Sequence, residues 1–320
     1  MMKKFFDCSI NQLSNSLHNQ RSLGPIENDM MKDLGKYADH HGWQRTGDYK
    51  EADLIITNGF YPDEILEWSE KHSIAKIKRM DGIYWLNERK HKNEIYNNAA
   101  LESNHVIFIS SYSCESLHKL YKIRPKNSTV ILNNVDDTIF YPINHKNTIF
   151  TWVTSATNWT REEKRLNCLV NFAKTAAKDD IINMIGRCDY ELPQNIIKHG
   201  YLEDQQQMHH IIANSDAMLS FFFRDAGSKV TCQGVSCKLP VLYSDTGGLR
   251  EIVKENGIFM QDYTKIDFSD ITPELSVFEM IKKSKIFKEH YGSLVSNYKK
   301  RKETYQDTLS RYFEIFKLYI

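Results

Sequence analysis

The chain has 320 residues, 41% of them apolar and 26% charged, and its 42 basic and 41 acidic side chains leave a net charge of +1. This balance excludes an overall electrostatic attraction to nucleic acid or anionic lipid. No apolar run approaches the roughly 18 residues that a membrane-spanning helix needs, and the N-terminus lacks an apolar signal-peptide core. The six cysteines are scattered without a Cys-x-x-Cys pair, which is typical of free thiols. We therefore expect a cytoplasmic protein, and its length favours two domains.

Strand and helix patterns alternate through the first half, as they do in a parallel α/β sheet. Gly24-Pro25 precedes the first helix, which is typical of a turn followed by proline at a helix start. The expected strands are 5–10, 53–57, 75–80, 106–110 and 130–132, and the expected helices are 26–37, 63–71, 94–103 and 117–121. We interpret the basic clusters at 76–79 and 299–302 as solvated surface.

Turn-forming residues interrupt this alternation at 133–142, so we place a hinge at 143–147. The alternation then restarts. The expected extended segments are 149–153, 181–185 and 196–200, the expected helices are 165–177 and 205–214, and the chain is largely helical from 271 onward. These patterns predict a first domain at 1–144, a second at 145–300 and a final helix at 301–320.

The most informative segment is 220–253. Its apolar strand stops at Arg-Asp-Ala-Gly-Ser (224–228), and a helix that carries Gln233 on its second turn follows. A helix start after a strand offers unpaired N–H groups and a positive dipole end, which suit a phosphate. Asp225 and Gln233 are eight positions apart, which is about 12 Å along a helix. That length matches a sugar–diphosphate–ribose, so the spacing predicts a nucleotide-sugar site.

This segment resembles the donor-binding core of family 4 glycosyltransferases of the GT-B fold. Members have an acidic residue, seven intervening residues and Glu, then Pro-Val, and then Gly-Gly followed by Glu. The matching positions here are Asp225, Gly227, Ser228, Gln233, Pro240, Val241, Gly247, Gly248 and Glu251. Two positions depart from the pattern, because Gln233 replaces the Glu that would hold the ribose hydroxyls and Lys238 replaces a usual Gly. Gln can still hydrogen-bond a diol, but it carries no charge.

A second motif, Asn-Trp-Thr-Arg-Glu-Glu-Lys-Arg-Leu (158–166), follows the first strand of the second domain, at the edge where doubly wound folds bind ligands. The resemblance implies that Lys164, with Arg161 or Arg165, holds the donor diphosphate. Fixed cations there would stabilise the charge that develops on a leaving nucleoside diphosphate. The structural alternative is an exposed helix start with Glu/Lys pairs.

Glycine-containing turns and a strand end complete the predicted site. The Thr246-Gly247-Gly248 turn should let the backbone approach the donor, and Gly24 lies in a loop similar to one of the family's donor loops. Asp81 ends a strand of the first domain and is expected to bind a sugar hydroxyl or to orient the acceptor. Tyr84 and Trp85 beside it could stack on a sugar or pack in the core. The 133–142 segment resembles the family's Asn-Gly-Val-Asp…Phe-x-Pro, with Asn134, which tolerates a left-handed turn, in place of Gly.

The resemblance implies two Rossmann-like doubly wound domains that face a cleft, with a C-terminal helix that crosses back to the first. It also implies a retaining transfer of a sugar from a nucleoside-diphosphate sugar to the hydroxyl of a glycan, a lipid-linked sugar or another acceptor, with Asp225, Asp81 and Lys164 as catalytic residues. No metal or other cofactor is expected, because the adjacent histidines at 40–41 and 209–210 suit no shared ion and neither a Walker loop nor GxGxxG occurs. The resemblance is also compatible with peripheral contact between the protein and a membrane.

Three alternatives stay open at this point. A phosphorylase or epimerase of the same fold would need its own acid/base residue in the first domain. A glycosyltransferase that acts on DNA bases would add a basic stripe, which the net charge does not favour. A non-catalytic nucleotide-sugar or glycan-binding protein is the third, and Gln233 is the reason to consider it.

Overall fold

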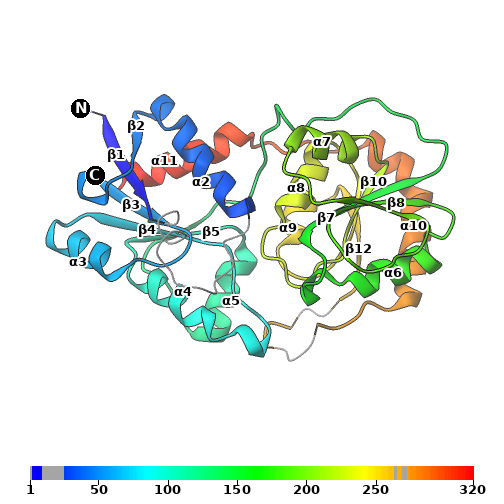
Figure 1. Ribbon diagram of the computed structural model, residues 1–320, viewed down its shortest axis with the longest axis horizontal. Coiled ribbons are helices and arrows are strands. Elements are labelled where there is room, and N and C mark those ends of the chain that lie inside the picture. Colours follow the sequence, from blue (N-terminus) through cyan, green and yellow to red (C-terminus); the bar gives the residue numbers. More distant parts are fainter. Residues whose placement is uncertain (1, 9–24, 263–264, 269–271) are drawn as a thin grey trace. The chain divides into compact units, whose positions relative to one another are not determined.

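The computed structural model describes residues 2–8, 25–262, 265–268 and 272–320. The chain divides into two compact units, one formed by Met1–Leu132 with Gln306–Ile320 and the other by Asn133–Tyr305. Within the described residues, each unit holds a six-stranded sheet whose paired strands are all parallel (Figure 1). The expected α/β class with two Rossmann-like sheets is therefore confirmed.

The first sheet has the strand order β2-β1-β3-β4-β5-β6. Its strands are β1 (Lys3–Asp7), β2 (Trp43–Thr46), β3 (Leu54–Thr57), β4 (Ala75–Met80), β5 (His105–Phe108) and β6 (Ser128–Val130). The helices of this unit are α2 (Pro25–Tyr37), α3 (Asp63–Lys71), α4 (Lys92–Leu101), α5 (Ser111–Tyr121) and α11 (Tyr305–Lys317), with short 3₁₀ turns η1 (Asp39–His41), η2 (Tyr49–Glu51) and η3 (Asn87–Arg89). The sequence patterns predicted each of these α-helices and every strand except β2.

The last helix, α11, packs on the sheet of the first unit. The rings of Phe313 and Phe316 lie with their centroids 6.3 and 5.6 Å from that of Phe5 on β1. Phe316 also meets Trp43 of β2 edge-on at 5.3 Å. All four side chains are buried. The chain therefore returns to its first unit at the end, as the sequence predicted.

The basic cluster at 76–79 is buried, so its interpretation as solvated surface is wrong. Lys76, Lys78 and Arg79 are 7%, 0% and 3% exposed. The reason is topological, because β4 pairs with a strand on both sides. The Lys78 ammonium donates to the backbone carbonyls of Asn58 and Arg79 at 2.5 and 2.6 Å, which offsets part of the cost of burying a cation.

The second sheet has the strand order β12-β11-β10-β7-β8-β9. Its strands are β7 (Thr151–Asn158), β8 (Ile181–Arg187), β9 (Ile196–Gly200), β10 (Ala217–Ser220), β11 (Val241–Ser244) and β12 (Gly257–Met260). Its helices are α6 (Leu166–Thr175), α7 (Gln205–Ala213), α8 (Lys229–Ser236), α9 (Leu249–Val253) and α10 (Val277–Ser296), with the 3₁₀ turn η4 (Glu162–Lys164). Strands β8 and β9 follow β7 on one side of the sheet, and β10, β11 and β12 follow on the other side of β7.

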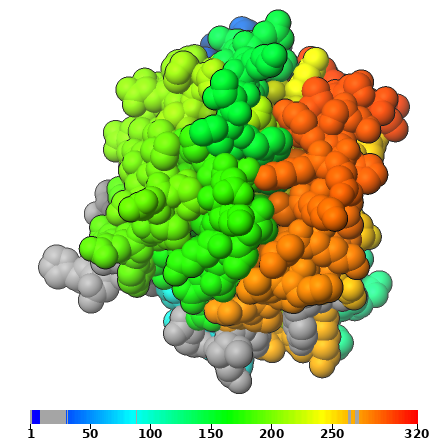
Figure 2. All heavy atoms as spheres, turned by 90° about the vertical axis from the view of Figure 1, so that its right-hand side faces the viewer, coloured from blue at the N-terminus to red at the C-terminus, as the bar shows by residue number. Residues whose placement is uncertain are grey.

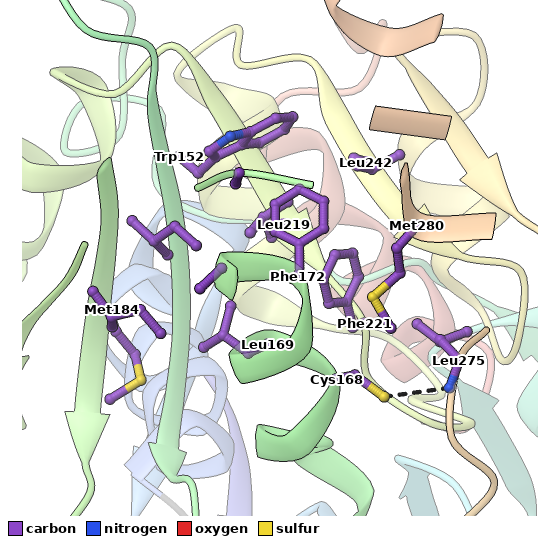
Figure 3. Packing of buried hydrophobic residues seen from close by; sticks show 14 of the residues in the cluster. Trp152, Cys168, Leu169, Phe172, Met184, Leu219, Phe221, Leu242, Leu275 and Met280 are labelled. Carbon is purple, nitrogen blue, oxygen red and sulfur yellow. Dashed lines mark hydrogen bonds between the residues drawn. The ribbon is translucent and has the colours of Figure 1, made fainter. Parts of the chain in front are cut away.

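A large aromatic core fixes α6 and α10 against this sheet (Figure 3). The ring of Trp152 meets those of Phe172 and Phe287 at centroid distances of 5.4 and 5.1 Å, and its Nε1 donates to Asp180. Met280 of α10 points into the same cluster (Figure 3). These contacts determine which face of α10 is buried.

The packing of α11 predicts how much its buried side chains contribute to the free energy of unfolding. Phe313→Ala removes a fully buried ring and should lower the free energy of unfolding by about 3–5 kcal/mol. Leu318→Ala is the matched control, because Leu318 follows the same helix and is 70% exposed; its change should stay within about 0.5 kcal/mol. Urea unfolding of the full chain measures both values, and equal losses would contradict the packing of α11 described above.

Candidate functional site

The sheet of the second unit changes its winding direction between β7 and β10. In doubly wound sheets, ligands bind beyond the carboxyl ends of the strands at such a switch point. The loop after β7 carries Lys164 and the loop after β10 carries Asp225, so both residues lie at this edge. Topology alone therefore brings together two residues that are far apart in the sequence.

Lys164 and Asp225 form an ion pair, with Nζ 3.2 Å from Oδ2. Their side chains are 17% and 19% exposed, so the pair is partly buried but open to a ligand. The ammonium also lies 4.3 Å from the ring centroid of Phe222, which offers a second favourable contact for the cation. The structure thus joins two of the three residues predicted to be catalytic.

The backbone of Asp225 is fixed by the glycine pair that follows β11. Gly247 has a φ of +80°, and a Cβ at this position would lie 2.3 Å from the carbonyl oxygen of Asp225. Glycine is therefore required for both the backbone conformation and the space. The N–H of Gly248 donates to the same carbonyl at 2.8 Å, and the N–H of Gly227 donates to the Asp225 carboxylate at 3.1 Å. Three predicted glycines thus hold the predicted acid in place.

Ser228 and Thr246 take structural positions in these turns. The Ser228 hydroxyl accepts a hydrogen bond from the Thr231 N–H and so caps α8. Thr246 is buried, and its N–H donates to the carbonyl of Ser244. Gly24, the remaining glycine of the predicted site, lies outside the described residues.

Gln233 lies inside α8 and is 7% exposed. Its side-chain oxygen Oε1 has no hydrogen-bond partner among the described residues. A buried acceptor without a partner carries a free-energy cost of about 1–3 kcal/mol. The prediction of a helical spacing needs correction, because α8 begins at Lys229 and Asp225 lies in the preceding turn. A helical rise therefore does not give the separation between Asp225 and Gln233.

Arg165 is a buried, paired cation. Its guanidinium is 2% exposed and binds both carboxylate oxygens of Asp262, at 2.5 and 3.1 Å. A bidentate pair of this kind is strong and geometrically specific. Arg165 also adopts a left-handed backbone conformation with a φ of 53°. The sequence predicts Arg165 as one of two candidates to bind the diphosphate. In the structure its guanidinium is buried and paired with Asp262.

Arg161, the other candidate, is 47% exposed and pairs with Glu163. Burial raises the pKa of the Glu163 carboxyl, but the Arg161 charge and hydrogen bonds to the carboxylate outweigh this effect. The pKa therefore lies below its usual range. Of the two arginines, Arg161 is the one whose side chain a ligand can reach.

Two further residues complete the region and were not predicted as site residues. Arg224 has a fully buried side chain and donates to the backbone carbonyl of Lys265 and to the Asp267 carboxylate, at 2.7 and 2.8 Å. Asn133 donates to the carbonyl of Gly227 at 2.6 Å, just before α8. The sequence placed Asn133 only in an interdomain turn, and no local pattern connects it with a loop 94 residues away.

In the first unit, Asp81 accepts a hydrogen bond from the buried guanidinium of Arg79. Arg79 also donates to the Tyr312 hydroxyl and to the side-chain oxygen of Asn58, at 3.1 and 3.2 Å. Trp85 is 8% exposed and packs against Tyr112. Of the two readings of Trp85, the structure therefore favours core packing.

The described residues contain no group of three His, Cys, Asp or Glu side chains that could hold a metal ion. Within that same part of the chain, no helix is both long and apolar enough to cross a bilayer. All six cysteines are described, and the structure has them as free thiols.

The contrast between the two arginines gives a stability prediction. Arg165→Ala leaves Asp262 buried without its partner and should cost about 3–5 kcal/mol of unfolding free energy. Arg161→Ala removes a pair whose arginine is 47% exposed and should cost about 1 kcal/mol or less. Urea unfolding of the two variants is the measurement. A small effect of Arg165→Ala would show that the Arg165–Asp262 pair does not hold the loop.

No protein-family model matches this chain, and no curated protein sequence matches it. Solved structures do match it over its whole length. Sucrose-phosphate synthase from Thermosynechococcus elongatus matches with a TM-score of 0.73 and 11% identity over 99% of both chains. HepE from Anabaena, solved with UDP and glucose, matches with a TM-score of 0.68 and 13% identity, over 99% of this chain and 100% of that one.

WaaG, described as a glycosyltransferase involved in lipopolysaccharide biosynthesis, matches with a TM-score of 0.64 and 11% identity, over 98% of this chain and 99% of that one. At these identities the likeness is one of fold. The strand orders of the two sheets and the return of α11 to the first unit agree with it. The chain has the GT-B fold.

Proposed function

We propose that the protein is a glycosyltransferase that moves a sugar from a nucleoside-diphosphate sugar to an acceptor hydroxyl with retention of anomeric configuration. The observation that carries this proposal is the Lys164–Asp225 pair, 3.2 Å apart at the switch point of the second sheet. At this edge the cation suits the negatively charged diphosphate of a sugar diphosphate, and the carboxylate suits the hydroxyls of its sugar. The GT-B neighbours support the proposal, because HepE was solved with UDP and glucose.

In this proposal, Lys164 binds the diphosphate together with the N-terminus of α8. Arg161 is the second cation within reach, while Arg165 positions the loop through Asp262. The bond between the anomeric carbon and the diphosphate oxygen breaks as the acceptor oxygen attacks from the same face, and the acceptor proton passes to the leaving oxygen. Lys164 stabilises the charge that develops there.

Asp225 is assigned to the hydroxyls of the transferred sugar and Gln233 to those of the ribose. The unpartnered Oε1 of Gln233 supports this assignment, because a diol can donate to it. Gly247, Gly248 and Gly227 then act by fixing Asp225. Asp81 of the first unit is assigned to the acceptor, with Arg79 holding its carboxylate.

Donor binding is tested first by thermal shift with UDP, GDP, ADP and their sugar derivatives. A ligand present at about a hundredfold its Kd should add about 2.7 kcal/mol of stability and so raise the Tm. Lys164→Ala should reduce this shift, because a charge contact is lost. Lys174→Ala, an exposed lysine of α6, is the control and should leave the shift unchanged. If no nucleotide raises the Tm of the unchanged chain, the donor site is wrongly assigned.

Paired calorimetry with a nucleoside diphosphate and its sugar derivative separates the roles of Asp225 and Gln233. Asp225→Ala should weaken the nucleotide sugar but not the free diphosphate, because it removes a sugar contact and also releases Lys164 from its ion pair. Gln233→Ala should weaken both ligands by about 1–2 kcal/mol through lost ribose hydrogen bonds.

Two variants serve as controls for this experiment. Gln233→Glu keeps the acceptor and should still bind both ligands, and Gln207→Ala, on the exposed side of α7, should change neither affinity. Equal weakening of both ligands by Asp225→Ala would refute the assignment of Asp225 to the sugar. Binding without sugar release from the unchanged chain would identify a binding protein instead of an enzyme.

A further inference from the structure

The two segments through which the chain passes between its units both bind α8. The first unit ends at Leu132 and the second runs from Asn133 to Tyr305, so Asn133 stands at one passage and the residues before Tyr305 stand at the other. The later segment, 297–304, follows α10, whose orange to orange-red atoms cover one side of the second unit in Figure 2. Asn133, α8 and the segment 297–304 all belong to the second unit.

The segment 297–304 contacts α8 at two levels. The Tyr298 hydroxyl donates to the carbonyl of Val235, in the last turn of α8, at 2.7 Å. Three residues later, Nη1 of Arg301 lies 3.6 Å from the thiol sulfur of Cys232, which is about one turn nearer to the start of the helix. The segment therefore runs along α8 toward its N-terminus, the end that follows Asp225.

Arg301 joins the two segments. Its Nη1 donates to the carbonyl of Asn133 at 2.8 Å and to the side-chain oxygen of Asn134 at 3.3 Å, and Asn134 donates to the carbonyl of Glu303 at 3.1 Å. The Cys232 thiol donates to the same Asn133 carbonyl at 3.2 Å, and burial raises the pKa of this thiol, so it keeps its proton. Asn133 and Asn134 are 7% and 4% exposed, so water competes little for these bonds.

The side chain of Asn133 fixes one peptide group at the start of α8. Its Nδ2 donates to the carbonyl of Gly227 at 2.6 Å, while the Gly227 N–H donates to the carboxylate of Asp225 at 3.1 Å. The peptide bond between Gly227 and Ser228 is trans, so the Ser228 N–H points away from this carbonyl and from Asn133. Ser228 is the N-cap of α8, and a helix start is where backbone N–H groups bind anions.

We propose that Asn133, held by Arg301, is a positioning residue for the donor diphosphate. With the Gly227 carbonyl bound to Asn133, the Ser228 N–H is presented to the diphosphate. Without this bond the peptide can rotate, because glycine permits many backbone conformations, and its carbonyl oxygen would then face and repel the anion. The proposal rests on the proposed function, since it concerns the diphosphate that Lys164 binds. It makes donor binding depend on both segments that join the units.

Hydrogen exchange of the ligand-free full chain tests whether Asn133 fixes this turn. The N–H groups of Thr231 and Cys232 report on it, because they donate to the hydroxyl and the carbonyl of Ser228, at 3.2 and 3.1 Å. Asn133→Ala and Arg301→Met should each speed their exchange about fivefold, the factor expected for one lost hydrogen bond. Lys300→Met is the matched control, because it removes an exposed cation next to Arg301, and it should leave this exchange unchanged.

Binding measurements test the consequence for the diphosphate. The probes are whichever of UDP, GDP and ADP gives the largest thermal shift, measured by calorimetry, and its nucleoside, measured by ligand-observed NMR. Asn133→Ala should weaken the nucleoside diphosphate about tenfold and Arg301→Met about fivefold. The affinity for the nucleoside should stay within about twofold, because the nucleoside lacks the phosphates that this peptide group receives. Lys300→Met should change neither affinity.

Three outcomes overturn the proposal. These are unchanged exchange in both variants, equal weakening of nucleoside and nucleoside diphosphate, and an effect of Lys300→Met as large as that of Arg301→Met. If Asn133→Ala fails to fold, Arg301→Met decides the matter, because it leaves Asn133 in place. If the unchanged chain binds no nucleoside diphosphate, the proposed function and the diphosphate role of Asn133 are both refuted, and the exchange rates still show whether Asn133 fixes the start of α8.

Discussion

The close contact between Gly247 and the backbone of Asp225 is the constraint on which the candidate site depends. No other residue at 247 would fit, because its Cβ would overlap the Asp225 carbonyl and its backbone would be strained at a φ of +80°. The contact ties the loop after β11 to the loop after β10. Lys164 then reaches the same aspartate from the loop after β7. Three neighbouring strand ends are thus joined at one aspartate, two through its backbone and one through its carboxylate.

Two buried arginines extend this arrangement to the segment that follows β12. Arg165 binds Asp262, and Arg224 binds Asp267, so the loops after β7 and β10 are both attached to that segment. Burying a guanidinium costs much desolvation free energy, which a carboxylate partner offsets only in the correct geometry. The burial of these charges thus serves to fix loop positions. The neighbouring residues differ accordingly, because the Lys164 side chain is 17% exposed and that of Arg165 is 2% exposed.

The sequence predicted most of the fold because the signals were local. Apolar runs with turn residues on either side located α3 and β4 to the residue, and Gly24-Pro25 located the start of α2. The edge strand β2 was missed because its four residues contain one apolar side chain, Trp43. Asn133 lies with the second unit through its bond to Gly227, whereas the turn pattern placed the hinge ten residues later. A contact between distant loops leaves no local signal in the sequence.

The site residues were predictable to a similar degree, and the two departures from the resembled motif have different physical consequences. Lys238, where the family usually has Gly, keeps a left-handed backbone with a φ of 62°, so the turn survives at a cost of about 1 kcal/mol. Gln233 keeps the shape of Glu but removes its charge from a buried position. A buried carboxylate would need desolvation and would repel a diphosphate nearby, whereas an amide would not. Gln233 therefore changes the electrostatics of the proposed donor site while leaving its geometry intact, and donor choice is the property on which that difference should act.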